Sequence, residues 1–344
     1  MTQRFTARAV LGGSLMLLVV AFLVGAVSGA YAISLPQLWN VLATLGQGAD
    51  KSPEHLVFLN IRLPRLVLGV AAGAGLGMAG TLMQGLFRNP LADPGLVGIS
   101  SGAALAAGVT IILGAWLWPV LPRTLGSWTL VLMAFGGGLS VTLLIYGLSR
   151  SEGGTRMALM LLAGIAVNAL AGAGLGFLSV MATDEQLRSL QFWLLGSLGG
   201  ARWSAVLLVA VAVLLSCVAA RSLAEPLNAI ALGEAQAALL GVDVERTKRR
   251  AIVVTAVAVG AVTATTGIIG FIGLIAPHWV RMVAGPDHRV VLPASALLGA
   301  ALVLAADTVA RTAMAPAELP LGVLTAFIGV PMFLWMLRRF RGRI

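Results

Sequence analysis

Residues 205–220 read AVLLVAVAVLLSCVAA, and residues 251–262 read AIVVTAVAVGAV. Neither run contains a charged residue, and neither alternates apolar with polar side chains as the strand of a membrane barrel does. A helix pairs its backbone hydrogen-bonding groups within itself, so continuous apolar runs in lipid form helices. These two stretches therefore predict an all-α protein, a polytopic transmembrane helix bundle.

The composition of the whole chain indicates the same surroundings. Hydrophobic residues make up 59% of the 344 residues, charged residues make up only 10%, and the mean hydropathy is +0.97. A soluble domain carries about 25% charged residues, so this chain lacks the polar surface that a water-soluble protein needs. Because one span takes about 20 residues, we expect about ten transmembrane helices in a single membrane domain, residues 1–344.

The apolar runs define the expected helices, and two segments need interpretation. Residues 187–198 are too few to cross a bilayer, so we expect a short helix at one surface. Arg4 and Arg8 precede the first run in the manner of a signal peptide, but that run is long enough to span and we expect it to stay uncleaved. The ten helices are expected at residues 10–32, 63–86, 95–114, 126–148, 157–180, 203–221, 251–273, 277–283 (a short one), 290–311 and 320–337.

The net charge of +10 comes from basic residues that flank the apolar runs. Such placement is typical of membrane topology signals rather than of a nucleic-acid surface, so we expect no nucleic-acid partner. With the N-terminus inside, sixteen of the 23 lysines and arginines lie on the inner side of the bilayer. The positive-inside rule therefore predicts that both termini are cytoplasmic.

The second expected helix has a face without side chains. Gly69, Gly73 and Gly77 recur every four residues, which places them on one side of a helix and lets another helix approach closely. At the inner end of this helix, Pro90 stops the helix, Asn89 suits a cap and Arg88 suits a helix C-terminus. We interpret residues 88–90 as a structural cytoplasmic turn.

The sequence lacks the residues of an enzyme. The histidines, His55, His278 and His288, lie in separate segments with no metal-ligand spacing, so no metal site is expected. A nucleotide-binding loop needs a Gly-Lys pair, and the two lysines, Lys51 and Lys248, follow Asp and Thr. Any ATP chemistry must therefore take place on another polypeptide.

The distribution of acidic residues bears on ion coupling. Carriers driven by ion gradients usually hold carboxylates near the middle of the membrane. Here the acids lie in loops except for Asp307, near the outer end of the ninth helix. This argues against ion coupling, although unwound backbone carbonyls can bind sodium without a carboxylate.

Residues 222–250 form the most charged stretch of the chain and are expected in the cytoplasm. The stretch is amphipathic, and Gly233 and Gly241 divide it into short helices. Such a two-helix projection could insert into a groove of a partner protein. It could equally rest on the inner lipid headgroups.

Three arginines lie at the outer ends of helices. Arg62 and Arg65 flank Leu63-Pro64, and Arg311 ends the ninth helix. Guanidinium groups suit bidentate capture of carboxylates on a docking partner. They are also common as anchors at the headgroups.

Several separate motifs resemble those of one family over nearly the whole chain. This sequence resembles the permeases for iron-siderophores, haem and cobalamin, which are type II ABC importers. The motifs are RLPR (62–65), GTLMQ (80–84), RNPLADPG (88–95), GISSG (98–102), LGE (232–234), LG (240–241), GFIGLIAPH (270–278), ADTVAR (306–311) and ELPLG (318–322).

The resemblance implies a homodimer in the bacterial inner membrane that works by alternating access. It implies two ATPase subunits, which carry the ATP and Mg²⁺, holding a knob at residues 230–242, and it implies no cofactor on this chain. It also implies a periplasmic binding protein whose glutamates meet Arg62, Arg65 and Arg311, and an outer gate in the segment 187–198. The coupling residues are expected to be Leu232, Gly233, Glu234, Ala237, Leu240 and Gly241, and the gate residues Leu187, Phe192 and Trp193.

The stretch between Thr183 and Trp203 is similar to haem permeases, so haem is the expected substrate. Ferric siderophores and cobalamin are the alternatives within the family. An ion-coupled secondary transporter is the alternative from another class, and a membrane enzyme is disfavoured by the missing catalytic residues.

Overall fold

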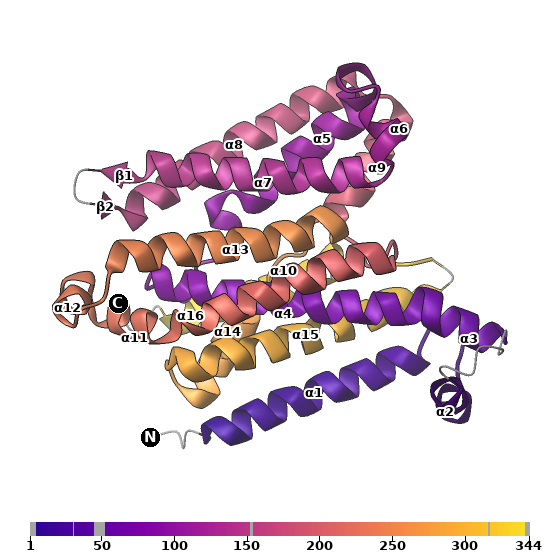
Figure 1. The fold of residues 1–344 in the computed structure, drawn as a ribbon, viewed down its shortest axis with the longest axis horizontal. Coiled ribbons are helices and arrows are strands. Elements are labelled where there is room, and N and C mark those ends of the chain that lie inside the picture. Colours follow the sequence, from indigo (N-terminus) through magenta and orange to yellow (C-terminus); the bar gives the residue numbers. More distant parts are fainter. Residues whose placement is uncertain (1–4, 30, 45–51, 152–153, 316, 341–344) are drawn as a thin grey trace.

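The computed structural model describes residues 5–29, 31–44, 52–151, 154–315 and 317–340. Long helices run side by side along one axis (Figure 1). The helices are α1 (Ala7–Val27), α2 (Leu35–Ala43), α3 (Pro53–Val57), η1 (Phe58–Arg62), α4 (Leu63–Leu86), η2 (Pro94–Val97), α5 (Ile99–Leu117), α6 (Leu121–Leu125), α7 (Trp128–Leu148), α8 (Met157–Met181), α9 (Asp184–Leu195), α10 (Trp203–Arg221), α11 (Ala224–Leu232), α12 (Glu234–Leu239), α13 (Val244–Thr266), α14 (Ile272–Ala284), α15 (His288–Thr312) and α16 (Leu321–Phe340).

The prediction of an all-α bundle is confirmed. In the part of the chain that the structure describes, the only strands are β1 (Arg150–Ser151) and β2 (Gly154–Thr155), which pair antiparallel between α7 and α8. Each strand has two residues, and together they form a tight connection between α7 and α8. They do not form a sheet that could carry a core.

Nine helices of the described residues are long and apolar enough to cross a membrane. They are α1, the continuous run α3–η1–α4, α5, α7, α8, α10, α13, α15 and α16. The eighth expected helix, the short one that we placed at 277–283, is the longer α14. Its 13 residues reach only about 20 Å along the helix axis, less than the bilayer core of about 30 Å.

The seventh expected helix lies seven residues earlier than the sequence indicated, at Val244–Thr266 instead of 251–273. Asp243 begins it, because its carboxylate accepts a hydrogen bond from the Arg246 amide at 2.9 Å. Gly267 ends it in a backbone conformation with φ of 73°, which a glycine adopts without strain. Residues 267–271 then form no helix before α14 begins.

Two further boundaries differ from the prediction. Helix α1 ends at Val27 rather than at residue 32. Helix α9 begins three residues earlier than 187 because Thr183 and Gln186 form a capping box, in which each side chain binds the other residue's backbone. Between the first two expected helices the structure contains α2 and α3, while Asp50 and Lys51 lie outside the described residues.

Helix α4 is the centre of the bundle and packs along α15. Its glycine face makes this approach possible, as the sequence predicted. A Cβ atom on Gly73 would lie 2.3 Å from the Gly299 carbonyl oxygen, and one on Gly77 would lie 2.1 Å from that of Ser295. Gly69 faces the Leu304 side chain. The two backbones are therefore in direct contact, a packing that only glycine allows.

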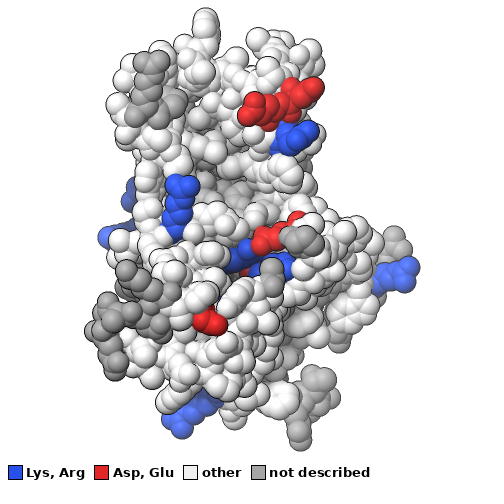
Figure 2. Space-filling view, turned by 90° about the vertical axis from the view of Figure 1, so that its right-hand side faces the viewer, with Lys and Arg blue, Asp and Glu red and all other residues white. Residues whose placement is uncertain are grey.

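The bundle has two ends, which we name after the elements found there. The α12 end carries α12, the β1–β2 hairpin and the start of α1, and the marks of both termini lie there (Figure 1). The α9 end carries α9, α6 and α3 (Figure 1). Figure 2 views the α9 end, where charged side chains are few and lie among uncharged ones.

Candidate transport machinery

The C-terminus of α1 is held by two arginines at the α9 end. Arg62 donates to the carbonyl oxygens of Ala26 (2.6 Å) and Val27 (3.2 Å). Arg311 donates to the carbonyl oxygen of Ser28 at 2.6 Å and to that of Gly25. The last carbonyls of a helix lack partners within it and carry partial negative charge. Two guanidinium groups from α15 and the η1–α4 run therefore supply the cap that ends α1 at Val27.

Arg65 binds two carboxylates at once. Its Nε atom lies 3.0 and 3.1 Å from the two oxygens of Asp307, and its Nη2 lies 2.9 Å from Asp307 Oδ1. The Nη1 and Nη2 atoms donate to Glu318 at 2.8 and 2.9 Å. Asp307 is buried, whereas the Glu318 side chain is 44% exposed. Arg65 thus joins α4 to α15 and to the loop before α16.

The three arginines predicted to dock a binding protein are not a free cationic surface. Arg62, Arg65 and Arg311 are only 5%, 9% and 7% exposed, and each binds groups of its own chain. Neighbouring carbonyls and carboxylates occupy the guanidinium groups, which the sequence did not indicate. Docking at this place stays a prediction, and it would require these contacts to rearrange.

Glu318 is the accessible member of this cluster. The hydrogen bonds from Arg65 lower the pKa of its carboxyl, and the positive charges of Arg65 and Arg311 act in the same direction against partial burial. Glu318 is therefore ionised at neutral pH. It faces the surface of the α9 end and closes the cluster from outside.

The segment predicted as an outer gate is the helix α9. Phe192 is exposed, while Leu187 and Trp193 are half-buried. The Gln186 side chain donates to the carbonyl oxygen of Ile112 at the end of α5. The gate role itself stays a prediction. Helix α9 has 12 residues, too few to span a bilayer, and it lies at one end of the bundle, as the sequence indicated.

The end of α9 meets two other helices through backbone contacts. The Ser197 amide donates to the Thr266 carbonyl oxygen at 2.8 Å, and the Leu321 amide donates to that of Gly196 at 3.0 Å. A Cβ atom on Gly267 would lie 2.1 Å from the Trp193 carbonyl oxygen. Glycines therefore let the end of α9, the end of α13 and the start of α16 touch.

The turn at residues 88–90 has the geometry of a helix stop. Arg88 adopts a left-handed conformation with φ of 50°. The Asn89 amide reaches back to the Gln84 carbonyl oxygen at 3.2 Å, and the Asn89 side chain accepts from the Leu91 amide at 2.9 Å. Pro90 follows and cannot continue the helix. Nothing in this geometry points to a ligand.

The knob projects at the α12 end and presents apolar side chains (Figure 1). Leu239 is 88% exposed, and Leu232 and Leu240 are also exposed. Gly233, with φ of 131°, separates α11 from α12, while Ala237 packs inward. Exposed leucines at the tip of a helical pair are typical of a surface that a partner covers.

Two coupling residues predicted beside these leucines occupy different places. Gly241 is exposed and has φ of 82°, so it supplies the turn after α12. Glu234 is half exposed and binds a lysine of the chain itself, as described next. Gly241 and Glu234 shape and fix the knob.

Lys248 joins the knob to the rest of the bundle. Its Nζ atom donates to Glu234 Oε2 and to the Thr155 carbonyl oxygen, both at 2.7 Å, and lies 3.4 Å from Glu245 Oε1. Glu245 also accepts from the Thr155 amide and hydroxyl at 2.8 Å. The Lys248 side chain is buried, and a buried charge is stable only when it is paired in this way. One ammonium group thus ties α12, α13 and β2 together.

A second set of contacts ties α11 to the start of α15. The Asn228 side chain accepts from the His288 amide at 2.9 Å and donates to Asp287 at 2.7 Å. It also lies 2.7 Å from His288 Nδ1. Sequence analysis missed this set and the Lys248 contacts, because the partners are far apart along the chain and no motif marks them.

Among the described residues, no group of three or more His, Cys, Asp or Glu side chains could hold a metal ion. Asp307, the acid we noted within a membrane helix, is bound by Arg65 and lies 3.5 Å from Arg311. Its charge is therefore compensated inside the protein.

Comparison with known proteins places the chain in one family. The model of the FecCD transport family matches residues 17–339. A solved structure described as an inward-facing conformation of a metal-chelate type ABC transporter superposes with a TM-score of 0.84 at 30% identity, and the match covers 96% of this chain and 99% of that one. The fold is therefore that of a type II ABC importer permease.

Curated relatives include permeases for two kinds of substrate. The chain is 46% identical to the hemin transport system permease protein HmuU of Yersinia pestis over 341 residues, 99% of this chain and 98% of the relative. It is 38% identical to the vitamin B12 import system permease protein BtuC of Klebsiella pneumoniae over 342 residues, 99% and 97% of the two. For the cobalamin permease BtuC of Halobacterium salinarum the identity is 44% over 298 residues, 86% and 77%. The chain belongs to the FecCD transport family and is a permease of an ABC importer.

Proposed function

We propose that this chain is the permease of a haem importer in the bacterial inner membrane, with both termini in the cytoplasm. The substrate assignment is supported by the 46% identity to a hemin permease over 99% of the chain. The vitamin B12 permease that is matched over the same share of the chain is 38% identical. Ferric siderophores and cobalamin are the alternatives within the family.

The observation that supports ATP hydrolysis on a partner protein as the energy source is the exposed leucine surface of the knob. Leu232 and Leu239 end α11 and α12, Leu240 follows, and all three are exposed, as apolar side chains at a protein-binding surface are. The chain has no Gly-Lys pair to hold a phosphate. Both facts support a separate ATPase subunit that carries the ATP and Mg²⁺ and holds the knob of one permease chain. A pair of permease chains would then bind two ATPase subunits.

The pairing of two permease chains is supported by the surface of α8. Gly172 and Gly176 are four residues apart, and no other part of the chain lies within 4 Å of where their Cβ atoms would be. Small residues at this spacing allow a second helix to approach closely in lipid. We infer that α8 faces a second copy of the chain, so that the transport path runs between the two.

Alternating access follows from how the knob is attached. Movement of α12 pulls on Lys248, and Lys248 binds Thr155, two residues before α8 begins at Met157. A closing ATPase dimer would therefore move α8 together with the knob. At the other end, α9 is tied to α13 and α16, so it would follow the same motion as an outer gate.

Docking of a periplasmic binding protein belongs to the same proposal. The partner would meet the cluster of Arg62, Arg65 and Arg311 at the α9 end. Glu318 covers Arg65 from outside and is itself accessible. A carboxylate of the partner would have to displace Glu318 to reach Arg65.

The substrate is tested by uptake into proteoliposomes that contain the permease with its ATPase and its binding protein. Haem, cobalamin and a ferric siderophore are offered separately. ATP-dependent uptake of haem alone supports the proposal. Uptake of cobalamin or of the siderophore in its place would reassign the substrate within the family.

An ion-coupled carrier is distinguished in the same vesicles. Asp307, the acid within a membrane helix, is paired with Arg65 of its own chain. Uptake that stops when ion gradients are collapsed, while ATP is present, would favour that class instead.

A further inference from the structure

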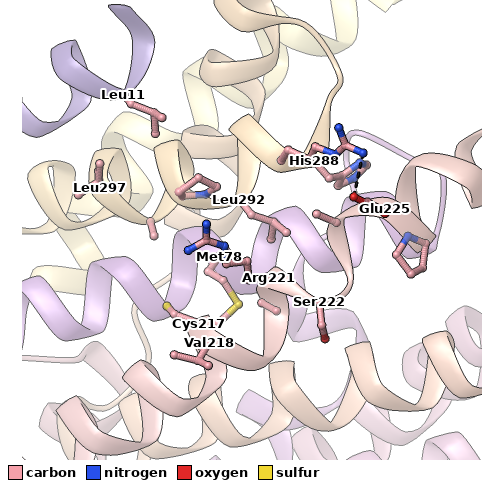
Figure 3. A pocket seen from close by; sticks show the side chains of 16 residues that line it. Leu11, Met78, Cys217, Val218, Arg221, Ser222, Glu225, His288, Leu292 and Leu297 are labelled. Atoms are coloured by element: carbon pink, nitrogen blue, oxygen red, sulfur yellow. Dashed lines mark hydrogen bonds and ion pairs between the residues drawn. The ribbon is translucent and has the colours of Figure 1, made fainter. Parts of the chain in front are cut away.

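A cavity of about 1060 Å³ lies between α1, α10, α11 and α15 at the α12 end. Figure 3 shows that its lining side chains come from several helices and surround an open space. Its floor is formed by Met78 of α4, and Leu11 of α1 and Val218 of α10 stand on either side. Val218 is largely exposed, so the cavity opens to the outside of the bundle.

The lining changes from polar to apolar along the helix axis. Glu225 and Arg289 lie at the rim, where α11 and α15 begin, while Arg221, the last residue of α10, extends its guanidinium inward past Leu292 (Figure 3). Leu292 and Leu297 lie deeper on α15, and Leu297 is about 12 Å from Arg289 along the axis. Charges at the rim, one guanidinium further in and hydrocarbon around and beyond it suit a phospholipid of the inner leaflet, with its phosphate drawn inward to Arg221.

The charges at the rim favour an anion. Arg289 forms an ion pair with Glu225 at 2.8 Å, and both side chains are largely exposed. Within the described residues, no carboxylate lies within ion-pair distance of Arg221, whose guanidinium lines the cavity. Two arginines against one glutamate leave one positive charge. A guanidinium binds a phosphate with two parallel hydrogen bonds, and basic pockets between membrane helices on the cytoplasmic side hold anionic headgroups.

We propose that this cavity binds one anionic phospholipid of the inner leaflet, with its phosphate on Arg221 and an acyl chain along Leu292 and Leu297. The lipid fills the space between α1 and α10, where the bilayer would otherwise leave a gap. It touches α11 through Glu225 and so borders the segment that carries the knob. Its headgroup therefore stabilises the position of α11 beneath the membrane surface.

Cys217, the single cysteine of the chain, lines the same cavity and serves as a local reporter. A lipid in the cavity covers its thiol and slows alkylation by N-ethylmaleimide. The full-length permease is placed in nanodiscs that contain either phosphatidylglycerol or phosphatidylethanolamine, and the alkylation rate is measured in each. We expect slower alkylation in phosphatidylglycerol by about fivefold, the factor that one arginine contributes near an anionic surface.

Two variants test the cause of this difference. Arg221→Gln should abolish it, whereas Arg150→Gln, which removes an exposed arginine of β1 outside the cavity, should preserve it. Ala296→Phe fills the apolar part without changing charge and should make the alkylation rate insensitive to lipid type. Circular dichroism of each variant shows whether the helices remain folded.

Some outcomes would overturn the proposal. Equal alkylation rates in the two lipids for the wild-type protein would show that no anionic lipid occupies the cavity. A difference that persists in Arg221→Gln would place the lipid elsewhere. Protection of Cys217 in detergent by inorganic phosphate alone, as strong as that by phosphatidylglycerol, would assign the rim to a free anion.

Discussion

The Arg65 guanidinium forms a two-pronged contact with the Glu318 carboxylate, at 2.8 and 2.9 Å, across 253 positions of the sequence. The contact fastens the loop before α16 to the buried centre of the bundle. Because Glu318 is partly exposed and Asp307 is buried behind Arg65, this is the part of the cluster that solvent and partners can reach.

The first prediction concerns acid. The pKa of Glu318 is lowered in the folded protein from its ordinary value of 4.5. Its stabilising contribution is therefore complete above that value and is lost as the pH falls through the folded pKa. The thermal midpoint of the wild-type protein in detergent should fall more between pH 7 and pH 4 than that of Glu318→Gln, which has no carboxyl to protonate.

The matched control for this measurement is Glu185→Gln, an exposed carboxylate of α9 with no ion pair among the described residues. It should follow the wild-type curve. If Glu318→Gln instead loses as much stability in acid as the wild-type protein, Glu318 does not contribute through its charge.

The second prediction concerns the contact between α4 and α15. Gly77→Ala places a methyl group 2.1 Å from the Ser295 carbonyl oxygen, so the two helices must separate. We expect a loss of about 1–3 kcal/mol in the free energy of unfolding, as in overpacked cores, seen as a lower thermal midpoint. Gly136→Ala on α7 meets nothing within 4 Å and should be neutral or slightly stabilising. Equal effects of the two changes would contradict direct backbone packing.

The third prediction concerns Lys248. Lys248→Met keeps the length of the side chain but leaves Glu234 and Glu245 without their cation. Amide hydrogen exchange should rise in α12 and at Thr155, because the ammonium holds both. Transport should fall more than ATP hydrolysis in the assembled complex.

The control is Arg249→Met, an exposed neighbour on the same helix. It should change neither exchange in α12 nor the ratio of transport to hydrolysis. If Lys248→Met leaves both unchanged, the ion pairs do not transmit motion from the knob.

The fourth prediction concerns the tip of the knob. Leu239 is 88% exposed, so Leu239→Asp should leave the permease stable while weakening its assembly with the ATPase, because a carboxylate would be buried without a partner. Co-purification of the ATPase with the tagged permease measures this. Ser151→Asp adds the same charge at the same end on β1 and should not reduce co-purification. If Leu239→Asp assembles with the ATPase as well as the wild-type protein does, the tip of the knob is not the surface that binds the ATPase.

Periodic patterns in the sequence predicted the parts of the fold that depend on one helix at a time. The spacing of Gly69, Gly73 and Gly77 shows a close helix contact because it follows the turn of a single helix. The exposed knob could also be foreseen, since Gly233 and Gly241 interrupt an amphipathic stretch. Both features are local, so no knowledge of the remaining chain was needed.

The fate of the arginines could not be predicted in this way. The position of Arg62 near a helix end was clear from the sequence, but its partners include the carbonyl groups at the end of another helix more than thirty positions earlier. Lys248 lies in the charged stretch 222–250, which the sequence places in the cytoplasm, yet it is buried against Thr155. The direction of a side chain depends on which helices pack together, and no single-helix pattern carries that information.

The measurement that tests the account most directly is haem uptake into proteoliposomes holding the permease, its ATPase and its binding protein, with and without ATP on the ATPase side. The account predicts uptake only with ATP, unaffected by ionophores and abolished by Leu239→Asp. Uptake by the permease alone, driven by an ion gradient without the ATPase, would contradict it.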